Sequence, residues 1–372
     1  MSPSLPPNAA DTMEHDEGGN DDRNPDQAGW DAIDRALAPL YGEQEPRHYG
    51  TLIKHALGGP DPLDGISAYK REQPVPHWHF VSYGLSELYA KESEDPERSG
   101  WGFELTFRLR DDSDASEPPV WALNFLQNLA RYVVGSGNAF ADGHYLNANG
   151  PIAADSDTRI RSVAFVRDPE LGEIDSPHGK LEFLQVVGLT NEEELALKRW
   201  STRKVLQAFE PHMPLWITDL ERDSLMQESE IAAEIAAGTA SDGSDTGFVF
   251  VDGLSWQQQA RRWRKPLTTV VLGARQVGEL LALLPLRLPF AKPFALVGAE
   301  CRIEFEHARR NAATADGADL RLSLTADTLR ELVANLQARE GQYPLRSFDL
   351  LSFLVRKTQI KDAEGRVVQT IG

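Results

Sequence analysis

A ten-residue stretch of alternating residues constrains the fold of this chain most strongly. Between Gly100 and Leu109, large apolar residues occupy every second position, and the residues between them include charged and hydroxyl side chains. Successive side chains of a β-strand point to opposite faces, so this pattern predicts a half-buried strand with one face in a core. Such a strand needs paired neighbours and a layer that covers its apolar face. The chain is therefore expected to contain a sheet.

Predicted helices flank this strand. Apolar residues recur with helical spacing over Trp30–Tyr41, Trp121–Val134 and Asn191–Phe209. Because helices and strands alternate irregularly, the α+β class fits the chain better than a regular βαβ repeat. Further strands are predicted at His77–Gly84, Ser162–Val166, Leu181–Leu189, Leu215–Thr218, Thr268–Leu272, Phe294–Val297, Cys301–Phe305, Leu350–Val355 and Val367–Ile371.

Two helices are predicted in the second half of the chain. Val277–Phe290 is the longest apolar stretch, interrupted by a glutamate, an arginine and prolines, and we expect a core helix followed by a strand. Leu324–Leu336 has helical spacing, with Thr325 at the N-cap position.

The length of 372 residues suggests two domains. Residues 1–28 are predicted to be a disordered acidic tail, because they hold too few large apolar side chains to offset the entropy of ordering. Residues 29–222 and 248–372 are the predicted N-terminal and C-terminal α+β domains. Between them, residues 223–247 combine an acidic helix with a Gly-, Ser- and Asp-rich end, 238–247, that has the composition of a flexible linker. The expected architecture is two mixed domains joined by a short hinge.

The composition excludes several classes of protein. The formal net charge is −19, so a polyanion would be repelled, and no nucleic-acid partner is expected. Cys301 is the one cysteine, which excludes an intrachain disulfide and a thiolate metal cluster. The N-terminal residues lack the basic and apolar regions of a signal peptide, and no apolar run reaches about 18 residues. We therefore predict a cytoplasmic protein without a membrane partner.

Charge is distributed unevenly along the chain. Between Leu254 and Arg310 there are ten Lys or Arg residues against four Glu, which makes this segment basic in an otherwise acidic chain. One interpretation is that the two halves dock, or hold an acidic partner in the groove between them. The other is that these charges lie on solvated strand faces, where ion pairs contribute little.

His77 and His79 are the candidate metal ligands. Residues two apart in a strand share a face, so both imidazoles could bind one metal ion. The alternative is that both histidines form hydrogen bonds with backbone or carboxylate groups around Trp78. A third metal ligand would have to come from His144, Glu87, Glu104 or Asp64.

Motifs for other chemistry are absent from the sequence. There is no Gly-x-Ser-x-Gly elbow, and Cys301 lies in a predicted strand, where a buried inert thiol is the usual case. The segment Gly58-Gly-Pro-Asp-Pro62 contains two prolines, which lack the amide donors that a phosphate needs. We therefore predict a binding protein with no catalytic activity and no cofactor. In such a protein only a small minority of the aromatic residues should lie at a contact surface.

A series of sequence blocks lies in order between Gly58 and Asp219. The blocks are Gly58-Gly-Pro-Asp-Pro-Leu-Asp64, Ser67-Ala-Tyr69, His77-Trp-His-Phe80, Ser82-Tyr-Gly-Leu-Ser-Glu-Leu-Tyr89, Gly100-Trp-Gly-Phe-Glu-Leu-Thr-Phe-Arg-Leu109, Leu129-Ala-Arg-Tyr-Val133, Phe183-Leu-Gln-Val-Val-Gly188 and Leu215-Trp-Ile-Thr-Asp219. In content, order and spacing they closely resemble the Suppressor of fused family. Farther along, Pro285-Leu-Arg-Leu288 and the helix after Leu324 resemble the second domain of that family in layout.

This resemblance implies two α+β domains joined by a hinge, without catalytic activity. In animal members the cleft between the domains closes on a short peptide strand of a zinc-finger transcription factor and retains that protein in the cytoplasm. This is β-augmentation, in which main-chain hydrogen bonds supply affinity and side-chain pockets supply specificity. The tyrosine of the family's Ala-Arg-Tyr-Val corresponds to Tyr132, and the family's Gly-Asp-His corresponds to Asp142-Gly143-His144, with Asp and Gly in changed order. Tyr132, Asp142 and His144 are therefore the predicted partner-binding residues.

The resemblance also bears on the partner. Animal members carry a long flexible insertion in the second domain, whereas this chain has only the short linker at residues 238–247. The acidic tail and the lack of eukaryotic targeting features look like the bacterial branch, whose members look like immunity proteins that bind and neutralise polymorphic toxins. The leading hypothesis is a cytoplasmic protein that clamps a peptide segment of a toxin or regulatory protein in its interdomain cleft. The alternatives are a metal-dependent enzyme that uses His77 and His79, and a regulatory scaffold protein.

Overall fold

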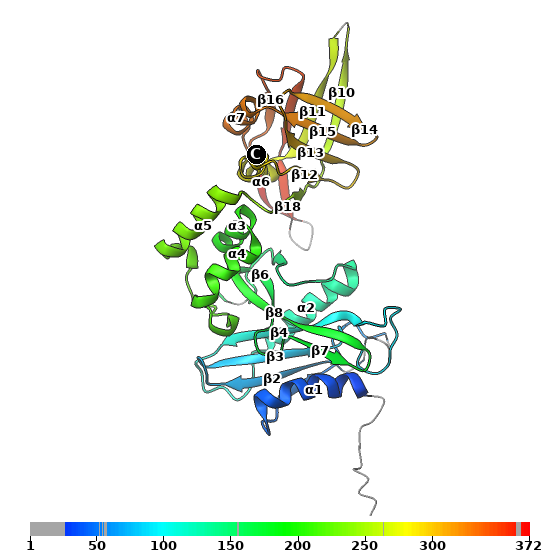
Figure 1. Ribbon diagram of the computed structural model, residues 1–372, viewed down its shortest axis with the longest axis vertical. Coiled ribbons are helices and arrows are strands. Elements are labelled where there is room, and N and C mark those ends of the chain that lie inside the picture. The colour runs from blue at the N-terminus through cyan, green and yellow to red at the C-terminus, as the bar shows by residue number, and fades with distance from the viewer. Residues whose placement is uncertain are drawn as a thin grey trace, which may run out of the picture.

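The computed structural model describes residues 27–51, 53, 55, 58–154, 156–262, 264–361 and 366–372. Of the predicted acidic tail, residues 1–26 lie outside the described residues. We call residues 27–242 the N-terminal half and residues 243–372 the C-terminal half; Figure 1 shows them as two bodies arranged along the long axis of the molecule.

The chain forms helices and strands in both halves. The helices are α1 (Ala28–Tyr41), α2 (Val120–Ser136), α3 (Asn191–Arg199), α4 (Thr202–Phe209), α5 (Ser229–Asp242), α6 (Ala274–Leu283) and α7 (Ala326–Asn335). The strands of the N-terminal half are β1 (Arg47–Gly50), β2 (Gly65–Arg71), β3 (His77–Tyr83), β4 (Arg98–Arg110), β5 (Tyr145–Asn147), β6 (Ile160–Arg167), β7 (Glu173–Ser176) and β8 (Gly179–Thr190). Those of the C-terminal half are β9 (Phe248–Phe250), β10 (Ser255–Arg261), β11 (Arg264–Gly273), β12 (Phe294–Val297), β13 (Arg302–His307), β14 (Ala312–Asp316), β15 (Asp319–Leu324), β16 (Gly341–Pro344), β17 (Leu351–Arg356), β18 (Thr358–Lys361) and β19 (Val367–Ile371).

One mixed sheet organises the N-terminal half. Its strand order is β1-β2-β3-β4-β8-β6-β5, with β7 pairing to β8 at the side. β4 and β8 run parallel, and the other neighbours are antiparallel. Helices and mixed sheets alternate irregularly along the chain, so the predicted α+β class is confirmed. No helix of the described residues has both the length and the apolarity that crossing a bilayer requires.

Both faces of this sheet are covered, which corrects the prediction for the alternating strand. On one face, Leu105 and Phe107 of β4 pack in a cluster with residues of α2. The opposite face was expected to meet solvent, yet Glu104 and Arg108 on it are fully buried, like Thr106 between them. α1 lies along this second face (Figure 1) and packs its own apolar residues onto it. A buried charge is tolerated only where it is paired and hydrogen-bonded, and sequence periodicity does not reveal such partners.

Two other local predictions differ from the structure. The predicted helix Asn191–Phe209 is two helices, α3 and α4, because Trp200 leaves the helical region with ψ −104° and its indole nitrogen donates to Asp242 at 2.9 Å. The predicted strand Leu215–Thr218 is largely a 3-10 turn over Pro214–Trp216. Leu215 and Trp216 have φ of 50° and 55°, which a strand does not accommodate, and Thr218 forms an isolated bridge with Leu109.

The C-terminal half holds two larger sheets around one core. Their orders are β10-β11-β17-β16 and β14-β15-β13-β12-β9, and β18 pairs separately with β19. α6 and α7 bury apolar residues in this core, and Thr325 caps α7 as predicted by accepting a hydrogen bond from the Thr328 amide. The strand predicted after α6 is wrong, because Leu284–Phe290 forms two 3-10 turns, each with a proline near its start.

The segment predicted to be a flexible linker contacts both halves. α5 continues to Asp242, and Gly243 ends it with φ of 68°. Ser244 is fully buried; its hydroxyl donates to the Lys198 carbonyl at 2.5 Å, and its own carbonyl accepts from Arg287 at 2.7 Å. The hydrophobic clusters follow the two halves of the chain, while the domain boundaries at residues 222 and 248 remain predictions.

Candidate functional site

A surface cavity of about 450 Å³ at the end of α2 collects most of the predicted partner-binding residues. Tyr132 and His144 both line it. Asp142 does not line the cavity but precedes Gly143, which does. The resemblance therefore identified residues that lie close together in space, although eleven residues of chain separate Tyr132 from His144.

Aromatic rings form one wall of this cavity. Tyr132 is 41% exposed, and its ring stacks on Phe140 with centroids 5.5 Å apart. Phe140 stacks in turn on Phe165 of β6 at 3.9 Å, which anchors the wall to the sheet. α2 ends next to it at Gly137, whose φ of 75° is the left-handed conformation that glycine favours. The result is a rigid aromatic surface with Tyr132 at its exposed edge.

A tight turn leads from this wall into β5. Gly143 has φ of 85°, and its amide donates to the Phe165 carbonyl at 2.8 Å. Asp142 forms an ion pair with Arg203 at 2.8 Å, and Arg203 also donates to the Asp142 carbonyl. The Asp142 carboxylate is therefore already paired with an exposed arginine.

The cavity lies where the two halves of the molecule meet. Tyr145, which lines the cavity and begins β5, shares a side-chain hydrogen bond with Thr246 of the C-terminal half. Close by, the Lys198 ammonium lies 2.8 Å from Glu194 on α3 and 2.8 Å from Glu279 on α6. Burial alone would lower the pKa of Lys198, but the hydrogen bonds to these two carboxylates outweigh it and raise the pKa. Lys198 is thus a charged bridge between the halves.

Two strand edges without a neighbour begin at this junction. Within the described residues, β5 is the last strand of the N-terminal sheet and β9 is the last strand of the five-stranded sheet. β9 starts two residues after Thr246, the residue that contacts Tyr145 at the start of β5. On β9, Phe248 and Phe250 are 49% and 75% exposed, and their rings meet edge to face at 5.3 Å.

Sequence reasoning missed four of these residues. Phe140, Tyr145, Phe248 and Phe250 were not predicted as site residues, since their placement depends on tertiary contacts. A signal did exist for β9, because Phe248-Val-Phe250 follows a Gly- and Asp-rich stretch and flanks a valine with two aromatic residues. In the structure that valine is buried and both phenylalanines are exposed.

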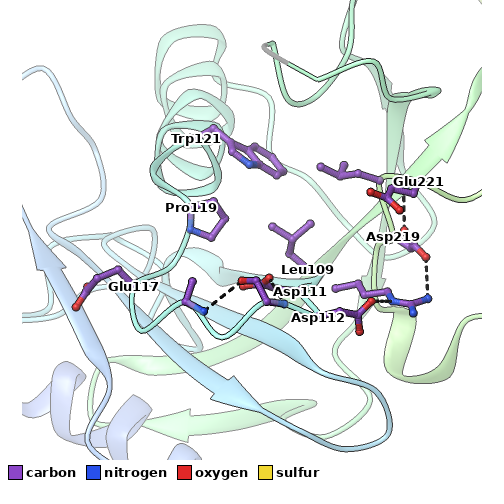
Figure 2. Close-up of a pocket in the computed structure, with 12 residues that line it drawn as sticks. Leu109, Asp111, Asp112, Glu117, Pro119, Trp121, Asp219 and Glu221 are labelled. Atoms are coloured by element: carbon purple, nitrogen blue, oxygen red, sulfur yellow. Dashed lines mark hydrogen bonds and ion pairs between the residues drawn. The ribbon is translucent and has the colours of Figure 1, made fainter.

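A larger cavity of about 690 Å³ lies at the C-terminal end of β4 (Figure 2). Its lining is rich in carboxylates, but most of them are occupied within the protein. Asp112 and Asp219 both bind Arg110, at 2.9 and 3.0 Å. Asp111 accepts hydrogen bonds from the Trp78 indole nitrogen at 2.7 Å and from the Ser113 amide at 3.0 Å. This cavity is therefore a weaker candidate than the junction.

The candidate metal ligands His77 and His79 lie inside the sheet. His79 is fully buried; its Nδ1 is 2.5 Å from the Tyr41 hydroxyl and its Nε2 is 3.6 Å from Asp168. His77 is also buried, and its Nδ1 donates to the Val75 carbonyl at 2.7 Å. Burial lowers the pKa of each histidine to about 4, so both are neutral at pH 7. His77 therefore matches the alternative of hydrogen bonding to the backbone, whereas the hydrogen bond of His79 goes to a tyrosine hydroxyl and Asp168 lies beyond hydrogen-bond distance of its Nε2.

The third ligands considered for a metal site bind elsewhere. The Glu104 carboxylate accepts from three consecutive amides, from Gly84 to Ser86, and from two serine hydroxyls. Asp64 accepts from the Tyr89 hydroxyl, and Glu87 binds Lys91. Within the part of the chain that the structure describes, no group of three or more His, Cys, Asp or Glu side chains has the arrangement of a metal site.

Comparison with known proteins identifies the family. Residues 59–223 match the sequence profile of Suppressor of fused protein (SUFU). A solved chain from the Sufu–Fu complex is 30% identical and superposes with a TM-score of 0.53; the match covers 98% of that chain and 58% of this one. The chain belongs to the Suppressor of fused family. The resemblance drawn from the sequence blocks is therefore confirmed.

Other members of the family extend this result. The chain is 34% identical over 236 residues to the Suppressor of fused homologs of Homo sapiens and of Mus musculus, and the match covers 58% of this chain. The same match covers 48% of each homolog, so it spans about half the length of these relatives. The crystal structure of Drosophila Suppressor of Fused superposes with a TM-score of 0.73 at 21% identity, over 88% of this chain and 97% of that one. The fold is therefore shared across most of the chain.

Proposed function

We propose that this protein is a non-catalytic, cytoplasmic binding protein that holds an extended segment of another protein at the junction of its two halves. The segment pairs with the free edges of β5 and β9, and Tyr132 lines the cavity beside them. This mode of binding is β-augmentation, in which the peptide adds a strand to an exposed sheet edge.

The observation that carries the proposal is the direction of the backbone groups on the two edges. In β9, the Val251 amide donates to Val297 and the Gly247 carbonyl accepts from Ala295, so every second residue faces β12. The N–H and C=O groups of Phe248 and Phe250 therefore point away from the sheet. In β5, the Ala148 amide donates to Arg161, so the same alternation directs the backbone of Tyr145 and Asn147 outward. A strand added at either edge would satisfy the outward groups of that edge.

The side chains around these edges favour an apolar segment. Phe248 and Phe250 are exposed aromatic rings beside unpaired backbone groups, a combination that soluble proteins usually avoid because it invites association. The stacked rings of Tyr132 and Phe140 offer a flat surface for a further apolar side chain. Aromatic residues of this kind dominate the energetics of protein interfaces.

The proposal also identifies the class of protein to which the partner belongs. The solved relative in complex with Fu is a Suppressor of fused protein bound to another protein, which supports a protein partner here. We propose that the partner is a toxin that this protein neutralises in a bacterial cell, on the basis of the resemblance to the bacterial branch and the short segment that precedes β9. A regulatory protein partner is the alternative.

The test uses two substitutions at the same position. The tagged full-length chain is co-expressed with the products of the adjacent genes, and dissociation constants are measured for each protein captured. Phe250→Ala removes the ring and keeps the amide, whereas Phe250→Pro also removes the outward N–H. We expect Phe250→Pro to bind about 2–10-fold more weakly than Phe250→Ala, because one backbone hydrogen bond contributes about 0.5–1.5 kcal/mol.

Two further outcomes separate the parts of the proposal. Tyr132→Ala should also weaken binding, and unchanged binding in both Tyr132→Ala and Phe250→Pro would exclude the junction as the binding site. If only regulatory proteins are captured and no adjacent product binds, the toxin assignment is wrong while the binding mode stands.

A further inference from the structure

A third cavity, of about 410 Å³, lies between α1 and the strands β1, β2 and β3. It is on the opposite side of the N-terminal sheet from α2, next to the helix at the bottom of Figure 1. α1 and β1 precede residues 59–223, which match the family profile, so this cavity is built partly from chain outside that match. Its volume is in the range that holds a side chain or a small ligand.

Aromatic rings form the walls of this cavity. Trp30 of α1 stacks on Tyr83 of β3 with centroids 4.5 Å apart, and Tyr41 of α1 stacks on Tyr69 of β2 at 3.7 Å. All four rings line the cavity. The faces of aromatic rings attract cations, and the protein already uses one of them in this way, because the Arg71 guanidinium lies 5.7 Å from the centre of the Tyr41 ring.

The charged groups of the cavity have one sign. Its lining includes the carboxylates of Asp34, Glu43 and Glu45, and none of the residues that line it is a lysine or arginine. None of the three carboxylates forms an ion pair with a described residue, although Asp34 accepts a hydrogen bond from the Tyr83 hydroxyl at 2.8 Å. Burial lowers the pKa of His48, the one histidine in the lining, so it is neutral at pH 7. The cavity is therefore complementary to a positive charge.

One hydroxyl in the lining has no hydrogen-bond partner among the described residues. Tyr69 is 6% exposed, and its hydroxyl forms no hydrogen bond with any residue that the structure describes. Burial raises the pKa of Tyr69 to about 12, so the hydroxyl stays uncharged and its oxygen is free to accept an N–H. This observation favours a cation that carries N–H donors over a quaternary ammonium group.

We propose that this cavity binds a guanidinium group. The planar guanidinium stacks on aromatic faces, donates to carboxylates in a fork, and has further N–H groups for the Tyr69 hydroxyl. The ligand is either the side chain of an arginine in another polypeptide or a free arginine-like molecule, which share this chemistry. The site is separate from the junction, so its test does not depend on the proposed function.

The test compares two probes of nearly the same shape that differ in the charge of the terminal group and in one N–H donor group. The probes are N-acetyl-arginine methylamide and N-acetyl-citrulline methylamide, and citrulline replaces the guanidinium by a neutral urea. Titrations of the full-length protein are followed by saturation-transfer NMR. We expect the arginine probe to bind with a dissociation constant on the order of millimolar, and the citrulline probe at least about tenfold more weakly. Equal binding of the two probes would overturn the proposal.

Substitutions in the lining locate the site. Glu43→Gln with Glu45→Gln, both at exposed positions, should weaken the arginine probe about 3–10-fold, and Tyr69→Phe should weaken it about 2–5-fold. Glu221→Gln, at an exposed position in the acidic cavity of Figure 2, is the matched control and should change nothing. Undiminished binding in both lining variants would place the cation elsewhere and overturn the assignment.

A third arm distinguishes the source of the guanidinium. Free L-arginine carries an α-carboxylate, which the lining carboxylates would repel, and an α-ammonium group, which they would attract, whereas the methylamide probe carries neither. Tighter binding of the methylamide probe supports an arginine within a polypeptide, and tighter binding of free arginine supports a small molecule. Both results presuppose that the cavity binds the guanidinium group.

Discussion

The interior of the N-terminal sheet and the free edge at β9 reverse the usual distribution of residues. Inside the sheet, the charged side chains of Arg108 and Asp168 are buried and bind each other at 2.6 Å. At the edge, Phe248 and Phe250 are exposed beside backbone groups that point away from the sheet. Removal of one partner of a buried charge pair destabilises a fold strongly because the other charge is left uncompensated, whereas exposed rings on an open edge suit a partner. Substitutions in the two regions should therefore separate stability from binding.

The largest effect is expected from Arg108→Leu. This guanidinium binds Asp168 at 2.6 Å and Glu170 at 2.8 Å, and it also donates to Gln185. Its removal leaves the buried Asp168 carboxylate without its counter-ion, so the free energy of unfolding should fall by about 3–5 kcal/mol in urea denaturation.

Arg110→Leu is the matched control for this variant. Arg110 lies two residues farther along β4 and also binds two carboxylates, but its side chain is 43% exposed. Its loss should cost about 1 kcal/mol or less, because water screens the pairs. If the two substitutions cost the same, the buried network does not stabilise the fold.

The next effect is a pH dependence that arises from His79. Burial holds its pKa at about 4, below its ordinary value of 6.5, so between these values the unfolded chain binds more protons than the folded protein. The contribution to stability is complete above about pH 6.5 and is lost as the pH falls towards 4. Between pH 7 and pH 5 this one group should lower the free energy of unfolding by about 2 kcal/mol.

Urea denaturation at the two pH values tests this effect. His79→Gln should show a smaller loss between pH 7 and pH 5 than the unmodified protein. His212→Gln changes an exposed histidine and should leave the pH dependence unaltered. An equal loss in all three proteins would mean that His79 does not set the pH dependence.

The sequence predicted those helices and strands whose residue pattern lies within the element itself. α1, α2 and β3 match their predicted ranges closely, because their apolar residues repeat with the period of the element. β4 was predicted to have a solvent-facing side, and that prediction is wrong. The partner that allows Arg108 to be buried is Asp168, sixty residues farther along the chain, and no pattern within β4 indicates it.

The candidate site was less accessible from the sequence. Tyr132 and His144 came from the family resemblance, and the structure places both at one cavity. The edge of β9 was not predicted, because whether a strand is an edge depends on the pairing order of the whole sheet. The link between Tyr145 and Thr246 depends in turn on how the two halves meet.

The smallest effect on stability is expected at the edge strand, where three consecutive residues form an internal comparison. Phe248 and Phe250 are exposed, and Val249 between them is buried. Phe248→Ser with Phe250→Ser should change the free energy of unfolding by only about 0.5 kcal/mol, since surface substitutions remove few contacts. Val249→Ala should cost more, up to about 1.5–3 kcal/mol, because it removes apolar contacts from the core.

Binding should show the opposite order on the same strand. The double serine variant should lose affinity for the captured partner, while Val249→Ala, which leaves both rings and the outward backbone groups in place, should keep it. Denaturation and binding are measured on both variants. Together they test whether the buried residue of β9 contributes to stability and its two exposed residues to binding. If Val249→Ala lost as much affinity as the double variant while remaining folded, the exposed face of β9 would not be the contact surface.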